Sequence, residues 1–76
     1  MKMAIQFRDR IYIGTPESIV DDLWKGMLNP PSTRKEYMEG VQQRIGHGNQ
    51  FMQFENEKEF LEELDRLGHI TIMEII

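Results

Sequence analysis

The chain has 76 residues, a formal net charge of −4 and no cysteine, which is enough for one small domain over residues 1–76. The lack of cysteine excludes disulfides and thiolate metal sites and is compatible with a reducing compartment, so we expect a cytoplasmic protein. Apolar runs are only a few residues long, which excludes a transmembrane helix. Because small domains without disulfides often gain stability by association, we expect a soluble homo-oligomer with no membrane contact.

The acidic surplus is concentrated in the last third of the chain. Residues 55–76 hold seven acidic side chains against Lys58 and Arg66, whereas residues 29–54 carry a slight basic excess. The protein lacks the basic footprint of a nonspecific DNA-binding protein, so we do not expect a nucleic-acid partner. The acidic end would suit self-association or a basic partner protein, although a solvated helix face is the simpler explanation.

Alternating apolar residues predict strand structure from Met3 to Ile13. Arg8, Asp9 and Arg10 interrupt the alternation with charge. The interruption fits either a tight hairpin turn or a bulge in one long strand, and the hairpin is slightly favoured. Because neither residue at the centre of such a turn is a glycine, a two-residue turn there is expected to be strained.

The first helix is predicted from Pro16 to about Leu28. Thr15 is a good N-cap residue, and proline suits the first helical position because its missing N–H costs nothing there. The apolar residues of this segment repeat on one face over three turns. The prolines at positions 30 and 31 are expected to end the helix.

The second helix is predicted over residues 34–45. Thr33 and Glu36 have the spacing of a capping box, and Gly46 is the expected C-cap. Residues 50–54 then have the pattern of a short strand.

The third helix is predicted to begin after Asn56 and to end at Gly68, and residues 69–76 are predicted to form the last strand. That strand is apolar on both faces, which is typical of a central strand or of an interface. The expected fold is therefore α+β, with three helices over a small, largely antiparallel sheet in the order β(β)-α-α-β-α-β.

The start of the second helix combines hydroxyl and cationic side chains behind a double proline. Ser32 and Thr33 offer hydroxyl and backbone donors. Arg34 and Lys35 place positive charge at a helix N-terminus, where the macrodipole disfavours it. The arrangement is typical of an anion site, and Tyr37 lies one turn on, where it can stack on a ring. We predict that a phosphate-bearing, nucleotide-like small molecule binds here.

Arg44 and His47, at the far end of the same helix, are predicted to contact a second ligand group or a neighbouring subunit. In a dimer, two such helix starts can converge on one symmetric ligand. A simpler alternative stays open, in which the hydroxyls only cap the helix, the cations only solubilise it and Tyr37 lies at the edge of the core.

Catalytic motifs are absent from the sequence. It contains no G-x-S-x-G nucleophile elbow, no Walker A loop, no G-x-G-x-x-G fingerprint and no H-E-x-x-H zinc motif. His47 and His69 lie 22 residues apart and lack the spacing of metal ligands, so no metal site is predicted. Adjacent acids such as Asp21 and Asp22 diverge around a helix. We expect a binding protein without a cofactor and not an enzyme.

Two other functions stay open from the sequence. The first two helices can form a helix-turn-helix with residues 46–54 as a wing, an arrangement that the basic helix start supports and the acidic total opposes. The third helix can instead present acidic side chains to a basic partner protein that it inhibits or regulates. Those acidic residues are Glu55, Glu57, Glu59, Glu62, Glu63 and Asp65.

Residues 14–20 (GTPESIV), placed after a strand, resemble the strand–GTPE–helix opening of many small uncharacterised prokaryotic and phage reading frames. Residues 60–64 (FLEEL), placed before a glycine and a last strand, are similar to the ending of such frames. The resemblance names no characterised family and carries over no functional residues. It implies an accessory or anti-defence protein of a mobile element, which acts by blocking a host protein or by sequestering a nucleotide signal.

Overall fold

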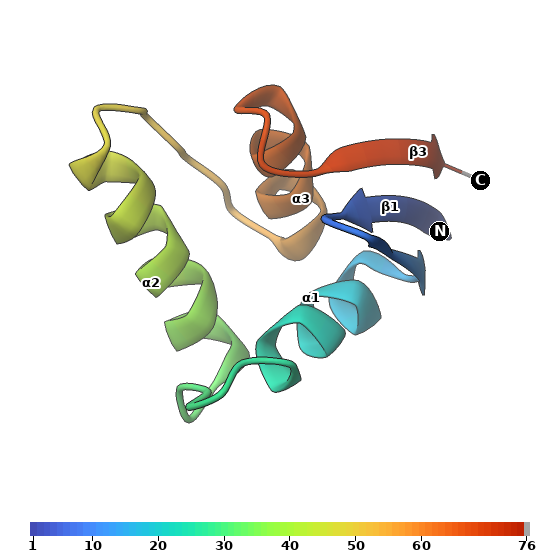
Figure 1. Ribbon diagram of the computed structural model, residues 1–76, viewed down its shortest axis with the longest axis horizontal. Coiled ribbons are helices and arrows are strands. Elements are labelled where there is room, and N and C mark those ends of the chain that lie inside the picture. Colours follow the sequence, from blue (N-terminus) through green and yellow to red (C-terminus); the bar gives the residue numbers. More distant parts are fainter. Residues whose placement is uncertain (76) are drawn as a thin grey trace.

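The computed structural model describes residues 1–75, which form a three-stranded sheet and three helices (Figure 1). The elements are β1 (Met3–Phe7), β2 (Arg10–Gly14), α1 (Pro16–Lys25), α2 (Arg34–His47), α3 (Glu57–Arg66) and β3 (Thr71–Ile75). The predicted α+β class with a small antiparallel sheet is confirmed. Ile76, the last residue of the predicted final strand, lies outside the described residues.

β1 is the central strand of the sheet, and it pairs antiparallel with β2 on one side and with β3 on the other. Phe7 lies opposite Arg10, so Arg8 and Asp9 form a two-residue hairpin turn. The favoured interpretation of residues 8–10 is therefore confirmed. Arg8 has a φ of 58°, the left-handed conformation that is costly for a residue other than glycine.

Each helix begins at the N-cap that the sequence predicts, and the cap side chain accepts the backbone N–H of the third residue after it. The caps are Thr15, Thr33 and Asn56. At the second and third helices a glutamate of the first turn, Glu36 or Glu59, also accepts the N–H of the residue before the cap. These bonds satisfy backbone donors that a helix N-terminus otherwise leaves unpaired.

The ends of two helices differ from the prediction. α1 ends before Gly26 and does not reach Leu28, because glycine is a poor helix former. Leu28 lies beyond the helix and is 95% exposed. α2 passes the predicted C-cap Gly46, continues to His47 and is capped by Gly48. A glycine inside a helix costs only about 1 kcal/mol relative to alanine, which the rest of the helix tolerates.

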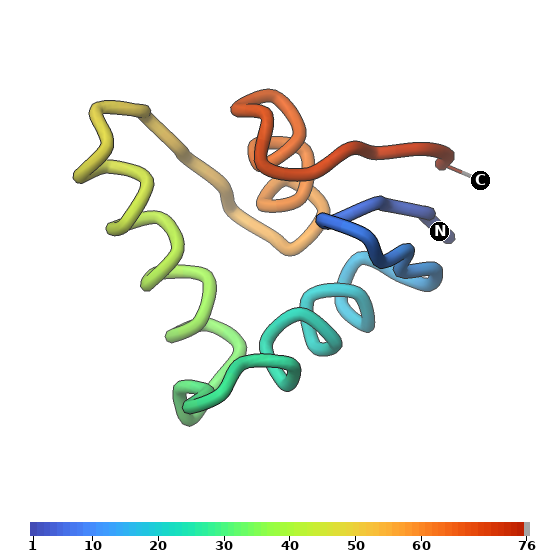
Figure 2. The backbone as a smooth tube through the Cα atoms, viewed as in Figure 1, coloured from blue at the N-terminus to red at the C-terminus, as the bar shows by residue number. Residues whose placement is uncertain are grey.

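Residues 50–54, predicted as a short strand, form instead an extended connection that returns from the end of α2 to α3 (Figure 2). Met52 is buried and Phe51 is 73% exposed, so the alternation of a strand is present without a strand partner. Side chains form hydrogen bonds with the backbone groups that a partner strand would otherwise pair. The Gln42 amide donates to the Met52 carbonyl at 2.8 Å, and Glu63 accepts the N–H of the following residue at 3.2 Å. The alternation reflects burial on one side and not sheet pairing.

The core lies between the inner face of the sheet, α1 and α3, with α2 adding side chains from the far side. Phe60 of α3 is fully buried at its centre. The Phe60 ring meets the Phe54 ring edge to face at 5.1 Å and the Tyr37 ring at 6.1 Å between centroids. The other fully buried side chains are Met3, Ile5, Ile19, Val20 and Leu61.

α2 lies farthest from the sheet, and polar bonds at its start hold it to the other two helices (Figure 1). The Arg34 guanidinium reaches Asp21 of α1 at 3.1 Å and Glu57 of α3 at 2.9 Å. Just before α2, the carbonyl of Pro31 accepts the indole N–H of Trp24 at 2.7 Å. These bonds fix the start of α2, and the buried side chains Tyr37, Met38 and Ile45 hold the rest of the helix against the core.

Replacing Phe60 by leucine should lower the free energy of unfolding by about 1–2 kcal/mol, because the change removes buried apolar surface and two aromatic contacts. The matched control is Phe51→Leu, in which the exposed ring should contribute less than about 0.5 kcal/mol. Urea unfolding followed by circular dichroism measures both variants. Equal losses in the two variants would show that the core is not organised around Phe60.

Replacing Arg34 by alanine should lower the free energy of unfolding by about 1 kcal/mol, because the substitution removes ion pairs to two helices at a partly exposed position. Lys35→Ala, on the next residue of the same helix, removes an exposed cation outside the ion pairs and should be neutral within about 0.5 kcal/mol. Urea unfolding again gives the two values. A neutral Arg34→Ala would mean that the ion pairs do not hold α2 in place.

Candidate functional site

The polar groups at the start of α2, the predicted anion site, are already bonded within the chain. The Ser32 N–H donates to the Glu36 carboxylate at 3.1 Å, and the Thr33 hydroxyl accepts the Glu36 N–H at 3.1 Å. Arg34 is bonded to the two carboxylates described above, and these acidic partners raise the pKa of its guanidinium against the opposing effect of desolvation, which is the largest single contribution. Only Lys35 is an exposed cation here. An anion arriving at this point would meet carboxylates.

The remaining predicted site residues lie on other parts of α2. Tyr37 packs its ring into the core, and Arg44 and His47 are exposed near the end of the helix. Arg34 and Arg44 are separated by about 15 Å along the helix axis at 1.5 Å per residue. The predicted residues therefore do not converge on one point. Tyr37 and Arg44 do share a cleft.

A cleft of about 610 Å³ opens between α2, the β1–β2 hairpin, the end of α1 and the segment joining α3 to β3. Its lining includes the apolar side chains Phe7, Leu23, Met27, Val41, Ile45, Leu64 and Ile70. Its polar lining comprises Arg8, Arg10, Tyr12, Tyr37, Arg44, Gln50 and His69. The volume is in the usual range of small-molecule sites, about 300–1,000 Å³.

Helical spacing explains how α2 contributes one wall of this cleft. Tyr37, Val41, Arg44 and Ile45 recur at intervals of three and four residues, so they lie on one face of the helix. The same face therefore presents apolar side chains to the cleft and one guanidinium near its end. Each of these four residues both lies on this face of α2 and lines the cleft.

Strand alternation explains the opposite wall. Arg10 and Tyr12 of β2 lie on one face and line the cleft, whereas Ile11 and Ile13 point to the other face. Arg8 reaches the cleft from the hairpin turn, and its guanidinium lies over the Phe7 ring at 5.1 Å from the centroid. The strained turn thus places two arginines side by side on the same wall.

The arginines of the chain divide into two groups by position. Arg34 and Arg66, outside the cleft, are paired with carboxylates. Arg8, Arg10 and Arg44 all line the cleft, and none of them has an acidic partner among residues 1–75. No aspartate or glutamate is among the cleft-lining residues. The cleft is therefore a cationic surface inside an acidic protein.

The pKa of Tyr37 reflects both its burial and its neighbours in the cleft. Burial raises the pKa of the Tyr37 hydroxyl, the positive charge of Arg44 lowers it in part, and Tyr12 raises it further. The ring of Tyr37 thus belongs to the core, while its hydroxyl belongs to the cleft. On another side of the cleft, His69 Nε2 and Gln50 Oε1 lie 3.0 Å apart and are hydrogen-bonded.

Sequence reasoning missed Arg8, Arg10, Tyr12 and His69 as site residues. The available signal was the charged interruption of an apolar alternation, which was sufficient to predict the turn. The alternation also places Arg10 and Tyr12 on one face. The alternation does not predict that this face of β2 lies opposite α2, because that arrangement depends on how α2 packs against the rest of the chain.

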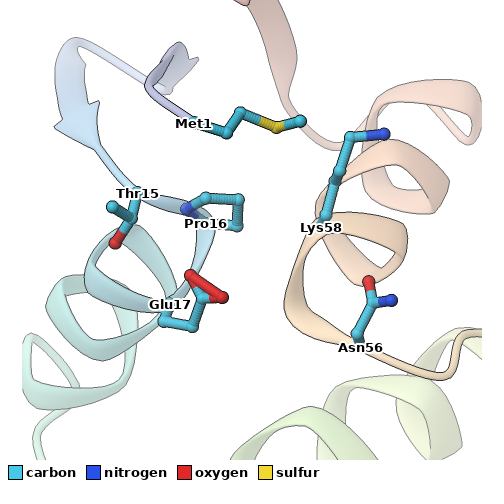
Figure 3. Close-up of a pocket in the computed structure, with 6 residues that line it drawn as sticks. All are labelled: Met1, Thr15, Pro16, Glu17, Asn56 and Lys58. Atoms are coloured by element: carbon cyan, nitrogen blue, oxygen red, sulfur yellow. The ribbon is translucent and has the colours of Figure 1, made fainter.

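A second cavity of about 290 Å³ lies between the starts of α1 and α3 (Figure 3). Its lining includes Thr15, Glu17, Asn56 and Lys58. The two caps already accept backbone N–H groups, and the Lys58 ammonium is bonded to Glu62 at 2.9 Å. With one carboxylate facing one engaged cation, this cavity offers less to a ligand than the arginine-lined cleft.

The acidic side chains of α3 are largely engaged within the chain. Glu57 binds Arg34, and Glu63 binds Arg66, whose hydrogen bond is the main reason that the pKa of Glu63 is lowered. Glu59 accepts a backbone N–H at the start of α3. Residues 46–54, the expected wing of a winged helix, contain no strand.

No family model matches the chain, and neither a curated protein nor a solved structure shows significant similarity to it. None of the helices formed by residues 1–75 has the length and apolar character needed to cross a membrane. The arginine-lined cleft is accordingly the basis on which a function can be argued.

Proposed function

We propose that this protein binds a phosphate-bearing, nucleotide-like small molecule in the arginine-lined cleft and acts by binding, not by catalysis. The observation that carries this proposal is the grouping of Arg8, Arg10 and Arg44, all without an acidic partner in the described chain, in a cleft without a carboxylate. Guanidinium groups form bidentate, charge-assisted hydrogen bonds with phosphate oxygens. Three unpaired guanidinium groups on one concave surface therefore favour an anionic ligand.

The apolar lining favours an organic ligand over a simple ion. Leu23, Met27, Val41 and Ile45 offer a surface for a ring or chain next to the cations. Tyr12 and Tyr37 add hydroxyl groups that can hydrogen-bond to polar edges of the ligand. A binding protein of this kind would act by sequestering its ligand, which is one of the two modes of action that the resemblance to phage reading frames implies.

The cleft replaces the start of α2 as the preferred site for this ligand. At the helix start the only strongly directional cation, Arg34, is used in ion pairs, and Glu36 lies over the backbone donors. In the cleft the three arginines are exposed, and apolar side chains line the same surface. The class of ligand is the same in both cases, and only the place differs.

Replacing Arg44 by glutamine should weaken the binding of adenosine monophosphate about tenfold or more, because a charge-assisted hydrogen bond contributes about 1.5–3 kcal/mol. Titration of the nitrogen-15-labelled protein by NMR at low ionic strength measures the Kd and maps the contact, since exposed charges are screened by salt. Lys35→Gln makes the same charge change on the same helix outside the cleft. An equal loss in both variants, or no saturable binding by the unaltered protein, would overturn the proposed function.

We also propose that the protein forms a homo-oligomer through the sheet face that the helices leave open. Ile11 and Ile13 of β2 are 56% and 68% exposed on that face. Their partners in the central strand, Gln6 and Ala4, add no charge to this face, and Glu74, which pairs with Ala4 from β3, places one carboxylate at its far edge. Exposed apolar patches of this kind are typical of protein interfaces.

Replacing Ile13 by glutamate should convert the oligomer to a monomer, because a charge would be buried without a partner in the interface. Leu28→Glu is the matched control, since it places the same charge on an exposed apolar residue in the loop after α1. Sedimentation velocity over a range of concentrations reports the subunit number. A monomeric unaltered protein would contradict the proposal, and so would dissociation by both variants alike.

A further inference from the structure

We infer that the ligand of the cleft is an organic diphosphate, an apolar or aromatic group joined to two or more linked phosphates. This inference rests on the proposed function and specifies its ligand. It follows from the positions of the three arginines that have no acidic partner among residues 1–75, from their charge and from the apolar surface of the same cleft. Each of these features constrains a different part of the ligand.

The three arginines stand on two separate walls of the cleft. Arg8 and Arg10 belong to the β1–β2 hairpin, whereas Arg44 belongs to α2. A single phosphate can satisfy one guanidinium fork fully, because each fork takes two of its oxygens. Linked phosphates extend the row of acceptor oxygens from one wall toward the other. The placement of the cations therefore favours a ligand with more than one phosphate.

The charge of the three arginines also favours a ligand with more than one phosphate. A phosphate monoester carries about −1.5 to −2 at pH 7, so it leaves part of the charge of three arginines without a counter-charge. Among residues 1–75, no carboxylate lines the cleft to supply the remainder. A second linked phosphate adds about one negative charge and brings the ligand close to the three positive charges of Arg8, Arg10 and Arg44.

Apolar surface lies beside the cations on both walls of the cleft. Val41 and Ile45 share the face of α2 with Arg44, and the Phe7 ring lies under the Arg8 guanidinium on the hairpin. The organic group therefore covers apolar surface next to the arginines, while the linked phosphates meet the guanidinium groups of both walls. The apolar surface distinguishes such a ligand from inorganic pyrophosphate, which would leave it uncovered.

Two kinds of molecule share this chemistry, and paired probes distinguish them. Adenosine diphosphate and adenosine monophosphate form one pair, and geranyl diphosphate and geranyl monophosphate form the other. Inorganic pyrophosphate tests the phosphates alone. NMR titration of the intact protein at low ionic strength gives each Kd, and the pair that binds more tightly identifies the organic group.

The expected result is that the diphosphate of the tighter pair binds about tenfold or more tightly than its monophosphate and than pyrophosphate. The double variant Arg8→Gln/Arg10→Gln should reduce the diphosphate advantage to near unity. The control Lys25→Gln/Lys35→Gln removes the same charge from exposed positions outside the cleft and should retain the advantage. Circular dichroism and amide NMR spectra establish that both variants are folded.

Each contrary outcome has a separate meaning. Equal affinity for the monophosphate and the diphosphate would overturn the inference and leave the proposed function standing. Pyrophosphate binding as tightly as the organic diphosphates would overturn it too, because the apolar surface would then contribute nothing. If no probe binds saturably, both the inference and the proposed function fail.

Discussion

The ion pairs of Arg34 hold the start of α2 against the other two helices, and the cleft depends on the position of that helix. One guanidinium from the start of α2 reaches a carboxylate on α1 and another on α3. A cation is unfavourable at a helix N-terminus, but Asp21, Glu57 and the nearby Glu36 offset the repulsion from the macrodipole. α2 then stands away from the sheet, with Tyr37, Met38 and Ile45 buried in the core and Val41 partly buried beside the cleft.

Pairing separates the arginines that maintain the fold from those available to a ligand. Arg34 and Arg66 form ion pairs with carboxylates of the chain, and Arg66 also donates a hydrogen bond to the carbonyl of Phe51. The arginines of the cleft form no ion pair with any of residues 1–75. In a protein with a net charge of −4, an anion is repelled at long range and attracted only where these cations are concentrated. Recognition of an anion would therefore be local, and it would weaken with salt less steeply than binding to a wholly basic surface.

Local signals in the sequence were sufficient to predict most of the fold. The caps Thr15, Thr33 and Asn56 begin their helices because short polar side chains satisfy neighbouring backbone donors without help from the rest of the chain. The hairpin at Arg8 follows from the break in an alternating pattern, which is also local. Residues 50–54 show where such reasoning fails, because alternation records which side is buried and not whether a partner strand exists.

The candidate cleft was harder to predict from the sequence than the fold, for a physical reason. Arg34 has the sequence context of an anion-binding residue, yet carboxylates from two other helices meet it in the folded chain. Conversely, Arg8 and Arg44 are far apart in sequence, and only the packing of α2 against the core brings them to one cleft. Tyr37 belongs both to the core and to the cleft, since its ring is buried and its hydroxyl faces the cleft. Which cations remain unpaired is a property of tertiary structure.

The hydrogen bond from Trp24 to the carbonyl of Pro31 gives the molecule a built-in optical reporter. Trp24 is the single tryptophan of the chain, it is half-buried against the core, and its indole N–H donates at 2.7 Å to the loop that leads into α2. Indole emission depends on hydrogen bonding and on exposure to water. Any displacement of α2 that pulls on this loop therefore changes the fluorescence of an unlabelled protein, so movement of the cleft wall can be followed in real time without adding a probe.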